Sequence, residues 1–112
     1  MLKQYAAVFI GAGFGAIFRW RLSTLTEPTS FPVGTLAANL IGCFILGLYI
    51  SQIRPDSALW LFVGVGFCGA LTTFSTLVFD LTRLSPGSGA AYLGLSLGLG
   101  VALFLAGRLL AQ

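Results

Sequence analysis

The sequence predicts an all-α membrane protein, a single domain over residues 1–112 built from four transmembrane helices. The chain is 57% apolar and only 8% charged, whereas a soluble domain has about 25% charged residues. It contains four apolar runs, each reaching the ~20 residues that a helix needs to cross ~30 Å of hydrocarbon. These runs are long and continuous rather than alternating, which favours helices over strands.

The four runs are roughly Gln4–Leu25, Phe31–Ile53, Ala58–Leu84 and Ala90–Leu110. We do not expect the first run to be a cleaved signal peptide, because it contains three glycines and a late Arg19. Short connections lie around Pro28, Pro55 and Pro86, and each proline is expected to close a helix and open a turn. No extramembrane domain is predicted, so the function should lie within the helices.

Basic residues are divided evenly between the two ends of the expected bundle. One end carries Lys3, Arg54 and Arg108, and the other carries Arg19, Arg21 and Arg83. A chain normally orients itself by an excess of Lys and Arg on the cytoplasmic side. The balance predicts insertion in both orientations, which would permit an antiparallel homodimer; a weak bias, with Arg19 too deep to count, is the alternative. The six basic residues never form a patch, so the net charge of +3 does not indicate nucleic-acid binding.

Small residues are expected to serve packing. Gly11 with Gly15 and Gly94 with Gly98 form pairs that let helix backbones approach closely in lipid. Cys43 and Cys68 lie inside apolar runs and are read as small buried residues.

The segment "GALTTFSTLVFD", residues 69–80, places four hydroxyl residues near the centre of the third run. Hydroxyl side chains compete with the backbone for hydrogen bonds, and glycine adds flexibility. If the helix breaks here, carbonyls near Gly69 and Thr72 lose their partners and could hold an alkali cation. The alternative is an unbroken helix whose hydroxyls bond to the preceding turn.

Four other polar residues within the runs are candidates for function. Thr35 and Asn39 share one face of the second helix, where Asn39 either makes an interhelical hydrogen bond or lines a polar path. Arg19 either extends to the membrane interface or concentrates anions at a vestibule. Asp80 either pairs with Arg83 or lies at the edge of an ion path. Hydroxyl and amide donors with little fixed negative charge suit an anion.

Three motifs together resemble one family. "GAGFGAIFRW" at 11–20, "GTLAANLIGCFILG" at 34–47 and "GFCGALTTFST" at 66–76 are similar to the signature segments of the small bacterial fluoride channels, the Fluc or CrcB family. The resemblance covers nearly the whole chain in order and spacing, with the fourth run least distinctive. It implies a multi-pass protein of the cell inner membrane, an antiparallel dual-topology homodimer with two fluoride pores, and a structural sodium ion at its centre.

The resemblance also implies roles for single residues. The third helix would break at its motif, and the carbonyls of Gly69 and Thr72 from both subunits would hold the sodium. Asn39 matches the pore-lining asparagine and Thr35 the hydroxyl one turn before it. The rest of the expected ion pathway is Phe74, Ser75, Thr76, Leu77, Arg19 at the vestibule, and Asp80 where many members have glutamate.

Leu77 departs from the family pattern, because it occupies the position of the second pore phenylalanine. Phe79 lies on a different face of the helix and is not an obvious substitute. The fourth run offers only Tyr92 and Ser96 as polar candidates. A pore of this kind would replace fluoride's water with hydroxyl and amide donors and with positive aromatic edges.

The expected function is therefore passive export of cytoplasmic fluoride through a channel. An alternative is a non-conducting or partly conducting subunit that needs a paralogous partner to complete the pores. A small multidrug exporter would need a membrane-embedded carboxylate early in the chain, and the first run has none. An enzyme is not expected, because the chain has no His, no paired acids and no nucleophile–base set.

Overall fold

A computed structural model describes residues 1–27 and 30–112 of the chain. Its elements are α1 (Leu2–Thr24), α2 (Val33–Tyr49), α3 (Ala58–Trp60), η1 (Leu61–Cys68), α4 (Gly69–Leu71), α5 (Phe74–Arg83), α6 (Pro86–Gly94), η2 (Leu95–Leu99) and α7 (Gly100–Leu110). The η segments are π-helical and continue the neighbouring α-helices without interruption. The described residues form four helical rods and contain no strand, which confirms the predicted all-α class. The connection expected around Pro28 lies outside the described residues.

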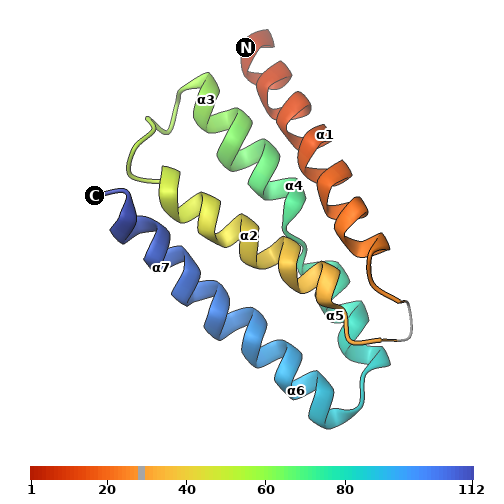
Figure 1. The fold of residues 1–112 in the computed structure, drawn as a ribbon. Coiled ribbons are helices and arrows are strands. Elements are labelled where there is room, and N and C mark those ends of the chain that lie inside the picture. The colour runs from red at the N-terminus through yellow and green to blue at the C-terminus, as the bar shows by residue number, and fades with distance from the viewer. Residues whose placement is uncertain (28–29) are drawn as a thin grey trace.

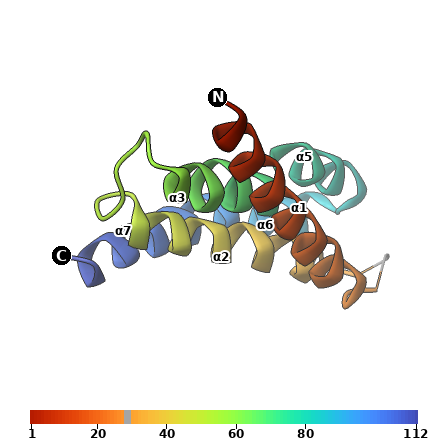
Figure 2. The same cartoon turned by 90° about the horizontal axis from the view of Figure 1, so that it is seen from above.

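The four rods form a flat bundle with principal extents of 45 × 29 × 19 Å. The rod that begins with α3 lies between α1 and α2, and α7 lies on the far side of α2 (Figure 1). The view from above in Figure 2 shows α2 and α7 side by side. The N-terminus, the α2–α3 connection and the C-terminus lie at one end of the bundle (Figure 1).

Glycines set the close spacing of the rods. A Cβ at Gly11 or Gly15 of α1 would collide with the carbonyl oxygen of Phe62 or Phe67 in η1. A Cβ at Gly47 of α2 would likewise collide with the Phe104 carbonyl of α7. The predicted packing role of the pair in α1 is confirmed, whereas a Cβ at Gly94 or Gly98 would meet no described atom within 4 Å.

The start of the fourth rod corrects the sequence prediction. Pro86 was expected in a turn before a helix at about Ala90, but it is the first residue of α6. The Ser85 hydroxyl caps this helix by accepting a hydrogen bond from the Ser88 amide at 3.4 Å. Proline is favourable at a first helical position, because its φ is already helical and the amide it lacks would have no partner there.

The surface of the bundle is strongly apolar. Ala58–Arg83 and Pro86–Leu110 are long and apolar enough to cross a membrane, and α2 is apolar but only 17 residues long. Large side chains such as Phe9 and Phe14 of α1 are exposed, while the core is small and includes Leu71 and Tyr92. A soluble monomer rarely exposes so much contiguous apolar surface, so the chain has the character of a membrane protein.

Candidate ion pathway

The third rod changes course at two threonines. α4 ends at Leu71 and α5 begins at Phe74. Thr72 (φ −84°, ψ 150°) and Thr73 (φ −149°, ψ 122°) between them have extended backbone. This interval lies within the segment for which the sequence analysis weighed a break against a continuous helix.

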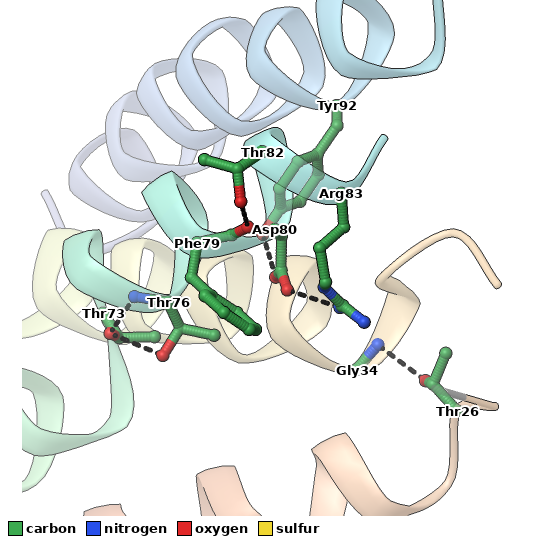
Figure 3. Close-up of polar contacts among 9 residues, drawn as sticks. All are labelled: Thr26, Gly34, Thr73, Thr76, Phe79, Asp80, Thr82, Arg83 and Tyr92. Atoms are coloured by element: carbon green, nitrogen blue, oxygen red, sulfur yellow. Dashed lines mark hydrogen bonds and ion pairs between the residues drawn. The ribbon is translucent and has the colours of Figure 1, made fainter. Parts of the chain in front are cut away.

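Thr73 caps the helix that follows. Its Oγ1 accepts a hydrogen bond from the amide of Thr76 at 3.2 Å and donates to the Thr76 hydroxyl at 3.2 Å (Figure 3). The Ser75 hydroxyl lies 3.3 Å from the same oxygen. Three of the four hydroxyls predicted in this segment therefore form one cluster at the N-terminus of α5. Thr73 was not among the predicted site residues, although a threonine immediately before a helix is a recognisable N-cap signal.

Asn39 of α2 holds the extended segment from the side. Its Oδ1 accepts a hydrogen bond from the Thr73 amide at 2.7 Å, and its Nδ2 donates to the Thr73 carbonyl at 3.3 Å. The predicted interhelical hydrogen bond of Asn39 is thus present as a two-point contact with the backbone. A carboxamide has two N–H donors, so the second one is left over from this contact.

The backbone ladder of α4 ends at Cys68. The Thr72 amide donates to the Cys68 carbonyl at 3.0 Å, and the Thr72 hydroxyl donates to the same oxygen at 2.9 Å. In a continuous α-helix the Gly69 carbonyl would next accept from the amide of Thr73, which donates to Asn39 instead. The Gly69 carbonyl is therefore released from its regular helical bond.

An open hollow of about 350 Å³ adjoins the extended segment. Its lining includes Asn39, Gly69, Thr72, Phe74, Leu77 and Ser96. The structure therefore brings together several predicted residues from α2 and from the third rod. Ser96 adds a buried hydroxyl that has no hydrogen-bond partner among the described residues.

The two residues expected to follow the pore on α5 have opposite exposures. Phe74 is 78% exposed, whereas Leu77 is 6% exposed. Both line the hollow, but the Phe74 ring lies mostly outside the protomer.

Asp80 lies in a separate polar cluster (Figure 3). It is 3% exposed, accepts a hydrogen bond from Arg83 at 2.9 Å and accepts another from the Tyr92 hydroxyl at 3.0 Å. The predicted pairing with Arg83 is confirmed. A second hollow of about 170 Å³ is lined by Asp80 together with Thr35 and Thr76.

Arg19 is half-buried near the end of α1 and lines neither of these two hollows. The structure of one protomer therefore does not bring it to the other predicted residues. Its neighbour Arg21 lies over the ring of Trp20, with the guanidinium carbon 5.9 Å from the ring centroid, as suits an interfacial pair.

These features define a helical membrane protein in which a non-helical segment, two hydroxyl residues and an amide surround a hollow. Residues 6–108 match the family described as CrcB-like protein, Camphor Resistance (CrcB). The chain belongs to this family, as its three motifs predicted.

Named relatives support the same class. A Methanocaldococcus jannaschii protein named fluoride-specific ion channel FluC is 49% identical over 85 residues, which cover 71% of this chain and 68% of the relative. A protein of the same name from Serratia proteamaculans is 44% identical over 90 residues, covering 75% and 71%. One from Escherichia coli O139:H28 is 48% identical over 90 residues, with the same coverage. The prediction that the protein is not an enzyme is confirmed by its membership of this ion-channel family.

Proposed function

We propose that the chain forms a fluoride-selective channel that crosses the inner membrane several times and exports cytoplasmic fluoride passively. The observation that carries this proposal is the hollow beside the extended segment, where Asn39, Thr72 and Ser96 supply amide and hydroxyl groups. The names of the relatives make fluoride the ion to expect.

The chemistry of the lining suits a small, strongly hydrated anion. Fluoride enters a narrow pore only if hydrogen-bond donors replace its water. The spare N–H of Asn39, the Ser96 hydroxyl and the positive edge of the Phe74 ring are donors of this kind. No carboxylate lines the hollow among the described residues.

Passive export needs no energy source within the protein. Hydrogen fluoride crosses membranes as a neutral acid and ionises in the cytoplasm, where fluoride is trapped. An interior-negative potential favours the exit of an anion by about 2.3 kcal/mol per 100 mV. An open path is therefore sufficient.

A structural sodium ion fits the extended segment. The carbonyls of Gly69 and Thr72 are hard oxygen ligands of the type that alkali cations accept, and Gly69 is exposed at the hollow. A bound sodium ion would supply positive charge that compensates these carbonyls.

An antiparallel homodimer would complete the two pores. The Phe74 ring and the Gly69 backbone are exposed in the protomer, which leaves them available to a second copy. The equal division of basic residues between the two ends would let copies insert in opposite orientations.

Fluoride efflux from liposomes that contain only this purified chain tests the proposal. Vesicles loaded with potassium fluoride, with valinomycin as the potassium shunt, are expected to release fluoride to an external electrode. Protein-free vesicles and vesicles loaded with potassium chloride are the controls. If the chain alone releases no fluoride, the homomeric channel is wrong, and restoration of flux by a co-reconstituted paralogue would identify a heteromer.

A further inference from the structure

We infer that Asn39 and Thr73 are positioning residues that create the cation site, by diverting the two backbone amides that would otherwise occupy its carbonyls. This inference rests on the proposed function, in which Gly69 and Thr72 hold a sodium ion. It assigns a role to two side chains that do not themselves touch the ion.

The first diversion concerns Gly69. In an α-helix its carbonyl would accept from the amide four residues later, which is that of Thr73. That amide instead donates to Asn39 Oδ1 at 2.7 Å. The Gly69 oxygen is thus free of its helical donor because a side chain from α2 takes the donor.

The second diversion repeats the first one three residues later. The carbonyl of Thr72 would accept from the amide of Thr76 in a continuous helix. The Thr76 amide instead donates to Thr73 Oγ1 at 3.2 Å (Figure 3). Both carbonyls assigned to the cation are therefore those whose helical donors are bound by a side-chain oxygen.

The two diversions are linked through Thr73. Asn39 fixes its amide and its carbonyl, which holds the residue in the extended conformation needed to cap α5. An unpaired buried amide is costly, so removing either side-chain acceptor favours return of the amide to the carbonyl. The Asn39 side chain also lines the hollow, so one amide would serve both the anion path and the cation site.

Two pairs of near-isosteric variants test this role. Asn39→Leu and Thr73→Val remove the acceptor oxygens, whereas Asn39→Asp and Thr73→Ser keep them. Cys43→Ala is the matched packing control, because Cys43 lies one turn further along α2 and lines the same hollow. The readout is the melting temperature of the purified protein in detergent against sodium concentration, with N-methyl-D-glucamine replacing sodium at constant ionic strength.

The wild type and Cys43→Ala are expected to melt at higher temperature as sodium rises, with the same midpoint. Asn39→Leu and Thr73→Val should shift that midpoint upward at least tenfold, while Thr73→Ser and Asn39→Asp stay within about threefold of the wild type or bind more tightly. Unchanged midpoints in both acceptor-less variants would overturn the inference. If those variants do not fold, a tenfold weaker midpoint in Thr73→Ser would also overturn it, since that variant keeps the acceptor.

A wild type whose melting does not respond to sodium would overturn the cation site and this inference together. The fluoride efflux assay on the same preparation separates that result from failure of the channel function.

Discussion

At the scale of single residues, the buried carboxylate of Asp80 shows how the bundle tolerates a charge. Its two oxygens have separate partners, Arg83 at 2.9 Å on the same helix and the Tyr92 hydroxyl at 3.0 Å on α6. The Arg83 guanidinium also lies 5.1 Å from the centroid of the Phe79 ring. A buried charge with both oxygens hydrogen-bonded avoids most of its desolvation penalty, so this cluster joins α5 to α6.

Loss of the Asp80 charge should destabilise the protein measurably. Asp80→Asn removes the ion pair and turns an N–H group towards a donor, which should cost about 1–3 kcal/mol once the half-exposed Arg83 is taken into account. The measurement is equilibrium unfolding in mixed micelles. Asp56→Asn is the matched control, because Asp56 pairs with Arg54 at 3.3 Å with both side chains largely exposed, and it should change stability by at most about 0.5 kcal/mol. Equal losses in the two variants would contradict a stabilising role for the buried cluster.

Leu77 tests the departure from the family pattern. It lines the 350 Å³ hollow, so a phenylalanine ring there has space to extend towards the path. An aromatic edge contributes about 0.5–1.5 kcal/mol, so Leu77→Phe should raise fluoride flux or apparent affinity by about two- to tenfold in the liposome assay. Leu81→Phe, one turn further on α5 and away from this hollow, should leave flux unchanged. If Leu77→Phe is neutral or harmful while Phe74→Leu abolishes flux, Leu77 serves packing and another group completes the pore.

At the scale of elements, α1 depends on two glycines that face η1. The carbonyl oxygens of Phe62 and Phe67 occupy the space where side chains at Gly11 and Gly15 would lie. These are backbone atoms of a neighbouring helix, so they cannot move aside as a flexible side chain could. The spacing between α1 and the third rod is therefore set by the absence of a Cβ.

Alanine substitutions along α1 should separate contact from helix propensity. Gly11→Ala should destabilise the protein by about 2 kcal/mol or more, because the helices must move apart and lose packing. Gly13→Ala meets no described atom within 4 Å and should be neutral or stabilising by up to about 1 kcal/mol. Thermal unfolding of the two variants in the same detergent measures the difference. A similar loss in both would show that α1 does not depend on this contact.

The elements also show how far the sequence could predict this protein. Four continuous apolar runs were sufficient for four helical rods, and the three motifs were sufficient for the family. The start of α6 was predicted wrongly, because a proline can either end a helix or begin one, and only the Ser85 cap decides between them. The contact of Asn39 with the Thr73 backbone could not be predicted, because it joins residues 34 positions apart whose helices must first pack.

At the scale of the whole molecule, the flat bundle has two ends with equal basic charge. Lys3, Arg54 and Arg108 belong to the end with both termini, and Arg19, Arg21 and Arg83 belong to the opposite end (Figure 1). Orientation in the membrane depends on the difference in Lys and Arg between the two sides. A difference of zero gives the chain no preferred orientation.

A small shift of this balance should therefore fix the orientation and abolish function. Ser51→Lys with Gln112→Lys adds two charges to the end with both termini, and all added side chains would lie at exposed positions. This double variant should insert in one orientation, as measured by C-terminal reporters active on opposite sides of the membrane. Its fluoride flux should fall to background, because no antiparallel partner forms.

The oppositely biased double variant, Ser30→Lys with Gly87→Lys, provides the decisive comparison. Ser30 and Gly87 are exposed, and a side chain at Gly87 would meet no described atom within 4 Å. Alone it should be as inactive as the first variant, since each population contains a single orientation. Co-expression of the two should restore flux, because each then supplies the partner that the other lacks. Full activity of either variant alone would show that a parallel assembly conducts, and the antiparallel dimer would then be wrong.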